Sequence, residues 1–176
     1  GKDYEYVITN SFKHITIQSL LREADLMGKL SKEKSIPDIY MNGSIEQRWE
    51  LLRGLMDTDG SADSMPVYNT SSLKLALQVQ ELVRSLGGIA TLSSRIPSYT
   101  HNNEKLEGAE TYRIHIRIKS PKRCFSLPRK QDKILEETQY SENLKLRIES
   151  VVESRVDEAQ CISVDNEDKL YVVNDY

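Results

Sequence analysis

Residues 111–120, TYRIHIRIKS, alternate strictly between apolar and basic side chains, and this pattern limits the folds open to the chain. Successive side chains of a β-strand point to opposite faces, whereas those of a helix repeat about every 3.6 residues. The segment therefore predicts a strand with one face in a core and a cationic row about 20 Å long on the other. The core face comprises Tyr112, Ile114, Ile116 and Ile118, and the cationic face Arg113, His115, Arg117 and Lys119.

A second strand is predicted over residues 88–96, where the same alternation places Thr91, Ser93 and Arg95 on one face. A polar loop over residues 97–110 separates the two strands. Basic and hydroxyl side chains on a two-stranded ribbon suit the major groove of double-stranded DNA, which admits such a ribbon. The alternative is an edge strand whose positive charge prevents aggregation. The candidate DNA-binding residues are Ser93, Arg95, Arg113, His115, Arg117, Lys119, Lys122 and Arg123.

Apolar residues at helical spacing predict three helices in the first half of the chain. Ser44 and Gln47 have the spacing of a capping box at the start of one of them. Another is expected to be capped by Ser71 and ended by Gly87. The predicted elements are helices over residues 17–27, 45–57 and 72–86 and a short strand over residues 66–71.

Gly54 lies in the middle of the wide apolar surface of the 45–57 helix. A glycine inside a helix costs about 1 kcal/mol relative to alanine. Because glycine leaves room for close backbone approach, we expect it to lie in a buried contact with a second helix.

The formal net charge of −3 is unevenly distributed along the chain. Residues 113–133 hold eight lysines and arginines against the single acid Asp132, whereas residues 134–168 hold ten acids against three basic residues. This reversal predicts a domain boundary near residues 134–143, with domains over 1–133 and 134–176. The alternative is a solvated basic loop beside a solvated acidic one.

No segment approaches the roughly 20 apolar residues that a membrane span needs, and the N-terminal residues do not resemble a signal peptide. We therefore expect a cytoplasmic protein with no membrane partner. Cys124 and Cys161 lie far apart and there are three scattered histidines, so neither a disulfide framework nor a zinc site is indicated.

The 45–57 helix runs directly into the turn DTDG, residues 57–60. A calcium loop counted from Asp57 would need glycine at its sixth position and glutamate at its twelfth, which are Ala62 and Tyr68. A simple helix stop is disfavoured, because the helix dipole opposes negative charge at the C-terminal end. Two acids there indicate a cation partner, and Mg²⁺ is commonly held by one or two carboxylates together with phosphate oxygens.

Residues 52–60, LRGLMDTDG, resemble the LAGLIDADG motif of homing endonucleases. The wider stretch 34–61 is similar to the second motif region of endonucleases nested in inteins, and the likeness covers roughly residues 20–133. It implies an α+β fold, an αββαββ half with a saddle-shaped antiparallel sheet. The implied activity is Mg²⁺-dependent double-strand cleavage of a long DNA target for intein homing.

The resemblance also implies roles for individual residues. Asp59 would bind the catalytic Mg²⁺, Asp57 would cap or support the turn, and Gly54 would pack against a second motif helix. Lys119 would assist cleavage, with Lys122 as the alternative. The family needs two motif helices and we find one, so a second LAGLIDADG half is expected, either from a longer chain or from a second copy.

Residues 146–176 are predicted to form strands separated by acidic turns. They resemble the C-terminal splicing block of inteins, a short all-β Hint-type segment, whose terminal His-Asn pair we expect beyond this chain. The resemblance implies that Cys161 assists splicing and that host protein exteins are partners. The alternative for Cys161 is a small buried strand residue.

Two functional hypotheses follow. The first is an intein-borne DNA endonuclease, incomplete without a second motif helix. The second is a catalytically inactive endonuclease-derived domain that only binds DNA or supports splicing.

Overall fold

A computed structural model describes residues 16–101, 103–135, 148–158, 160–165, 167–169 and 171. The elements run in the order α1 (Ile17–Glu23), η1 (Ser31–Glu33), α2 (Asp38–Met41), α3 (Ile45–Asp59), β1 (Gly60–Ala62), β2 (Pro66–Thr70), α4 (Leu73–Ser85), β3 (Ile89–Arg95), β4 (Ser98–His101), β5 (Glu104–Glu107), β6 (Thr111–Arg117), η2 (Pro121–Cys124) and α5 (Pro128–Gln131).

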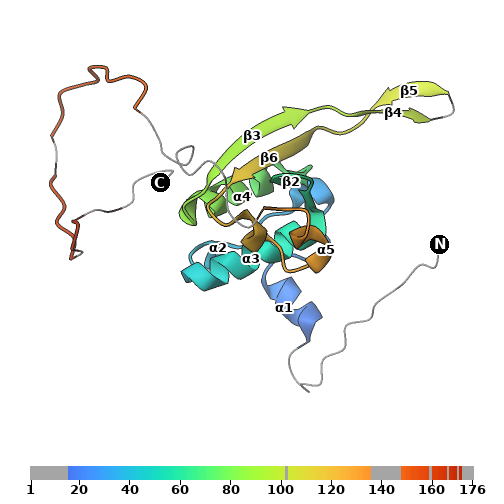
Figure 1. Cartoon of the computed structure of the whole chain (residues 1–176), viewed down its shortest axis with the longest axis horizontal. Helices are drawn as coiled ribbons and strands as arrows, with labels where there is room; N and C mark the ends of the chain where they lie inside the picture. Colours follow the sequence, from blue (N-terminus) through green and yellow to red (C-terminus); the bar gives the residue numbers. More distant parts are fainter. Residues whose placement is uncertain are drawn as a thin grey trace.

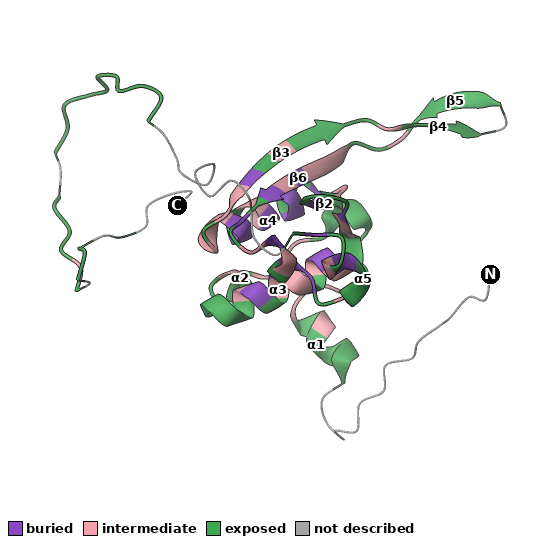
Figure 2. Cartoon of the chain, viewed as in Figure 1, coloured by how far each residue is buried: buried purple, intermediate pink, exposed green. Residues whose placement is uncertain are grey.

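Four strands form one antiparallel sheet in the order β1-β2-β6-β3, with α3 and α4 packed on one face (Figure 1). The fold is therefore α+β with an antiparallel sheet. Buried residues, coloured purple in Figure 2, gather where the two helices meet the sheet. The strict alternation over residues 111–118 is confirmed, since Ile114, Ile116 and Ile118 are at most 2% exposed. Among the described residues, no helix covers the opposite face of the sheet in Figure 1.

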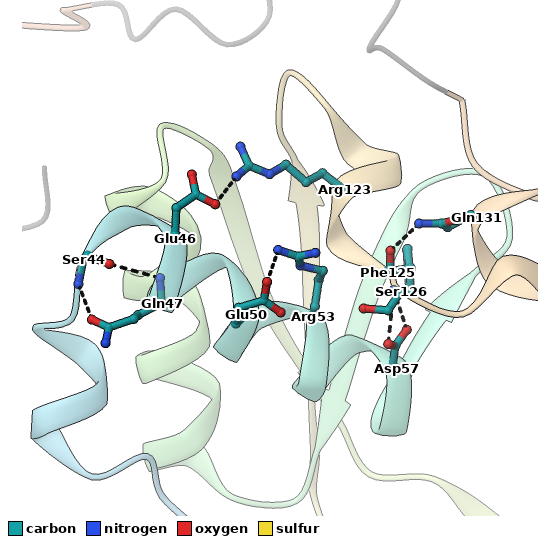
Figure 3. A network of polar contacts seen from close by, with 10 residues as sticks. All are labelled: Ser44, Glu46, Gln47, Glu50, Arg53, Asp57, Arg123, Phe125, Ser126 and Gln131. Carbon is teal, nitrogen blue, oxygen red and sulfur yellow. Dashed lines mark hydrogen bonds and ion pairs between the residues drawn. The ribbon is translucent and has the colours of Figure 1, made fainter.

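Helix α3 begins as its sequence predicts. The Ser44 hydroxyl accepts from the Gln47 N–H at 3.3 Å, and the Gln47 side chain accepts from the Ser44 N–H at 2.9 Å (Figure 3). Trp49, Leu52 and Met56 point into the core, whereas Ile45 is 60% exposed. The helix continues to Asp59, two residues past its predicted end.

Helix α4 is capped by Ser72, not by Ser71 as predicted. The Ser72 hydroxyl accepts from the Leu75 N–H at 3.2 Å and donates to the Lys34 carbonyl at 2.7 Å. Gln78 adds two bonds to the backbone of Ile36, at 2.7 and 2.8 Å. Capping at Ser72 therefore also ties residues 34–36 to α4, a long-range contact that adjacent serines do not reveal in the sequence.

Residues 97–110, predicted as a loop, contain the β4–β5 hairpin, which continues the β3–β6 ribbon away from the core (Figure 1). Pro97 has no N–H to give to the ladder, but its carbonyl accepts from the Gly108 N–H at 2.7 Å. All four pairs of the hairpin are exposed (Figure 2). Without a buried face, no apolar pattern marks these strands in the sequence.

Two predicted elements differ from the structure. Helix α1 ends at Glu23, not near residue 27. The strands predicted over residues 146–176 do not form in the described residues from Ile148 onward, where Val151 and Val156 are at least 88% exposed. Strands need neighbours with an apolar face, and nothing in the described part of the chain supplies one there. The predicted boundary at residues 134–143 falls mostly on undescribed residues, but Ile134 is packed into the core.

Among the described residues, no helix has both the length and the apolar character needed to cross a membrane.

Candidate active site and nucleic-acid interface

The end of α3 is tightly packed around Gly60. Its N–H donates to the Met56 carbonyl, and a Cβ added at Gly60 would lie 2.5 Å from that oxygen and 2.8 Å from the Met56 Cα. The φ of Gly60 is −83°, so this glycine is required by lack of space and not by an unusual backbone conformation. The final glycine of the DTDG turn therefore allows the chain to leave the helix directly into β1.

Gly60→Ala is expected to destabilise the chain by about 1–3 kcal/mol, because the added methyl group overlaps backbone atoms that cannot rotate away. Chemical denaturation monitored by circular dichroism measures the change. Gly54→Ala in the same helix is the matched control. Its Cβ would meet no described atom within 4 Å, so it should raise stability by up to about 1 kcal/mol. Equal effects at the two positions would contradict this account.

Asp57 connects the helix end to the segment after η2. Its carboxylate accepts from the Ser126 N–H at 3.1 Å and from the Leu127 N–H at 3.3 Å (Figure 3). These charge-assisted bonds satisfy two backbone donors immediately before α5. Asp57 therefore supports the local structure, as the family resemblance implies, and its oxygens are already in use.

Lys130 connects the same two segments from the other side, because this residue of α5 donates hydrogen bonds to the end of α3. Its ammonium donates to the carbonyls of Met56, Asp57 and Gly60 at 2.8, 2.8 and 2.6 Å, and the residue is 8% exposed. Burial and the neighbouring Arg129 lower the pKa of Lys130, while Asp57 and Asp59 act in the opposite direction. A cation at a helix C-terminus also complements the dipole. Sequence reasoning missed this residue, because nothing in a basic run marks which lysine turns inward.

Asp59 differs from Asp57 in having no such partners. It is exposed, and its carboxylate makes no hydrogen bond or ion pair with the residues that the structure describes. Burial, with a further contribution from Asp59, raises the pKa of Tyr68 to about 12. Asp59 and Tyr68 also line a largely apolar cavity of about 470 Å³, together with Leu51, Leu55 and residues of the 34–37 segment.

The side chains near Asp59 determine whether a divalent ion could bind there. No group of three or more His, Cys, Asp or Glu side chains gathers among the described residues, so these residues form no metal cage of their own. One available carboxylate at the end of a helix is nevertheless compatible with Mg²⁺, which is often held by one or two carboxylates and completed by water and phosphate oxygens. The residues therefore fit a metal shared with a phosphate ligand.

The uncovered face of the sheet carries the predicted cationic row. By register, Thr91 lies opposite His115, Ser93 opposite Arg113, and Ile89 opposite Arg117. On the other side of β6, Asn69 lies opposite Arg113. The structure thus gathers five of the predicted DNA-binding residues on one face, namely Ser93, Arg95, Arg113, His115 and Arg117.

The remaining basic candidates lie elsewhere. Arg123 pairs with Glu46 at 2.7 Å, near the start of α3 (Figure 3). Its guanidinium also stacks over the Trp49 ring, 4.4 Å from the ring centroid. Lys122 lies with it in η2 and is half-buried. These two positions therefore belong to the helical side of the domain.

Lys119 lies two residues beyond the end of β6. Gly60, next to Asp59, pairs with Tyr68, which pairs with Ile114 in the middle of that strand. Within the described part of the chain, Lys130 is the lysine that reaches the helix end bearing Asp59. A role for Lys119 in cleavage stays a prediction.

Gly54 is exposed and contacts no second helix among the described residues. Half-buried Leu51 and Leu55 flank it on α3. A buried contact at Gly54 would therefore have to come from outside the described part of the chain.

Gly54→Leu is expected to leave the melting temperature of the chain itself nearly unchanged, because the site is open. It should weaken association with a second motif helix, since leucine would hold the backbones apart. Thermal melting and sedimentation velocity at rising concentration measure the two effects for association with a second copy. A variant that associates like its parent would show that another face is used.

The family model for the LAGLIDADG-like domain matches residues 46–125. Residues 46–125 form a LAGLIDADG-like domain. The matched span runs from the first turn of α3 to the residue after η2 and includes the whole four-stranded sheet. Within the LAGLIDADG-like domain, the motif helix is α3, and its last residue is Asp59.

The chain is also similar to a protein named replicative DNA helicase DnaB from Mycobacterium intracellulare. The two are 31% identical over 164 residues, which cover 90% of this chain and 27% of that protein. The chain thus spans about a quarter of the length of this relative.

Cys161 lies outside the LAGLIDADG-like domain and is exposed, which contradicts the alternative of a buried strand residue. Its predicted role in splicing stays a prediction. Cys124 is fully buried in η2, and burial raises its pKa to about 12, so it is a structural thiol.

Proposed function

We propose that this chain is one half of a homing endonuclease carried by an intein, and that it cleaves phosphodiester bonds of double-stranded DNA with Mg²⁺. The observation that carries the proposal is the exposed Asp59, without a partner among the described residues, at the end of the motif helix of a LAGLIDADG-like domain. Asp57 in the same turn and Lys130 from α5 are instead engaged in hydrogen bonds to the backbone.

The chain's own residues would bind and orient the DNA. The arginines and hydroxyls on the uncovered sheet face provide cationic and hydrogen-bonding contacts to phosphates and base edges. Asp59 would hold a divalent ion together with a phosphate oxygen. When bound, such an ion supplies activated water and neutralises the charge on the leaving oxygen.

The intein context is supported by the similarity to the protein named replicative DNA helicase DnaB. The relative is named as a replicative helicase, and the similar stretch makes up about a quarter of it. This sequence contains no G-x-x-x-x-G-K-[ST] phosphate loop. A LAGLIDADG-like stretch inside a protein with a helicase name is consistent with an inserted element. Residues 134–176 would then belong to the splicing part, and Cys161 would assist splicing.

A plasmid cleavage assay tests the function. The protein, together with its second motif helix, is incubated with a plasmid carrying the uninterrupted host gene, in the presence of Mg²⁺. Linearisation of this plasmid, and not of one in which the insert already interrupts the site, is expected. Binding without cleavage would favour the inactive DNA-binding domain, an alternative supported by the single available carboxylate at the helix end among the described residues.

The salt dependence of binding tests the interface separately. Replacing Arg113 and Arg117 by Ala is expected to reduce the slope of log K against log salt, by about 0.9 for each phosphate that the protein no longer neutralises. Fluorescence anisotropy with a 30-base-pair duplex of mixed sequence measures the slope. Arg123→Ala is the control and should leave it unchanged, because Arg123 is paired on the helical side. The opposite pattern would place DNA on the helices.

A further inference from the structure

Arg113 occupies the centre of the uncovered sheet face. It lies on β6, between β2 and β3, and is paired on both sides, with Asn69 and with Ser93. Arg95, by contrast, lies on the edge strand β3, and Arg117 lies beyond the last residue of β6 that pairs with β2. When such a face enters the major groove, its centre meets the base edges on the groove floor, whereas its margins meet the phosphates.

The Arg113 guanidinium has donors that the sheet does not use. The side chain is half-buried, and its Nε is buried and donates to no partner among the residues that the structure describes. None of the paired residues of the four-stranded sheet is Asp or Glu. A buried donor without an acceptor costs free energy, and such a group in a native structure needs an explanation. An acceptor brought by a ligand would provide one.

Asn69 is the second available group at this centre. The nearby hydroxyls are in use, since Ser93 donates to the Arg113 carbonyl at 3.4 Å and Thr111 to the Arg95 carbonyl at 3.2 Å. Asn69 is exposed, and its amide makes no hydrogen bond with the residues that the structure describes. A guanidinium can bind both O6 and N7 of guanine, and a carboxamide both N6 and N7 of adenine.

We infer that Arg113 and Asn69 determine sequence specificity, with Arg113 bound to a guanine and Asn69 to an adenine in the neighbouring base pair. This inference rests on the proposed function and deepens it by naming a feature of the target. Opposite residues of an antiparallel pair have Cα atoms about 4.5–5.5 Å apart, and base pairs follow one another about every 3.4 Å. Two such side chains therefore reach adjacent base pairs. Arg95 and Arg117 contact phosphates instead.

Selection of bound duplexes tests this without relying on cleavage. The chain is mixed, without divalent metal, with a pool of duplexes carrying 20 randomised base pairs, and the bound sequences are read. The parent should enrich a guanine next to an adenine, each at least about fivefold over other bases. Arg113→Gln should change the guanine to adenine, because glutamine pairs with adenine. Asn69→Ala should lose the neighbouring adenine alone.

Two control variants separate base contacts from phosphate contacts. Arg117→Gln should leave the selected sequence unchanged while weakening binding to every duplex, with a salt slope smaller by about 0.9. Arg113→Lys retains donors for guanine and should keep the guanine of the parent. Thermal melting confirms that each variant is folded.

The outcomes separate the two proposals. A chain that binds no duplex contradicts the proposed function and this inference with it. A chain that binds duplexes but enriches no sequence overturns this inference alone. So does an Arg113→Gln variant that selects the sequence of its parent and only binds more weakly, with a smaller salt slope, because Arg113 would then contact a phosphate.

Discussion

Asp59→Asn is expected to reduce Mg²⁺-dependent DNA cleavage by at least about a hundredfold, since bound metal contributes several kcal/mol to charge stabilisation and each 1.36 kcal/mol is a factor of ten. Asparagine keeps the shape of the side chain but loses the charge that holds a hard cation. Duplex binding without metal should remain, because the basic sheet face is untouched. Single-turnover cleavage and anisotropy measure the two quantities on the protein with its second motif helix.

Asp57→Asn is the matched control for Asp59→Asn, two residues away in the same turn. It weakens the bonds to Ser126 and Leu127, so its main effect should be on stability. Equal loss of cleavage in the two variants, with both still folded, would show that the acids share one role. Cleavage that survives Asp59→Asn would remove the basis of the proposed metal site.

Lys130→Met is expected to destabilise the fold by about 3 kcal/mol, because it removes three hydrogen bonds from a charged donor to the end of α3. This is a large part of the 5–15 kcal/mol that stabilises a typical domain, as a rough guide. The corresponding fall in melting temperature is about 10–20 °C. Denaturation monitored by circular dichroism checks both values.

Lys133→Met provides the comparison, since Lys133 is exposed three residues further on and should have little effect. Combining Lys130→Met with Asp57→Ala should cost less than the sum of the two, because both changes release α3 from the 126–131 segment. Strictly additive losses would show that the two connections act independently.

Sequence periodicity was sufficient to predict a strand or helix where one face of that element is buried. The alternation over residues 111–118 and the capping box at Ser44 are both confirmed, because packing and local hydrogen bonds require particular residue spacings. The hairpin at residues 98–107 has no buried face, and the segment after residue 148 has no described sheet to join. In neither case does local pattern determine the structure.

The candidate site could likewise be predicted only in part. The motif pointed to the turn at residues 57–60, and the strand pattern pointed to the cationic face. Which acid is available and which lysine is turned inward depend on contacts across about 70 residues of sequence, such as Lys130 to Met56. Three-dimensional proximity of this kind follows from the path of residues 121–131 along α3, which no local spacing encodes.

The projecting β4–β5 hairpin sets a length scale for the target. From Ile89 to His101 the ribbon continues for 13 residues, about 43 Å at the rise of a strand. Bases follow one another every 3.4 Å or so along a duplex, so the ribbon runs beside roughly a dozen base pairs. Under the proposed function, one such half would therefore read about one helical turn of DNA. A pair of halves would then address a sequence of about two turns, which is long enough to be rare in a chromosome.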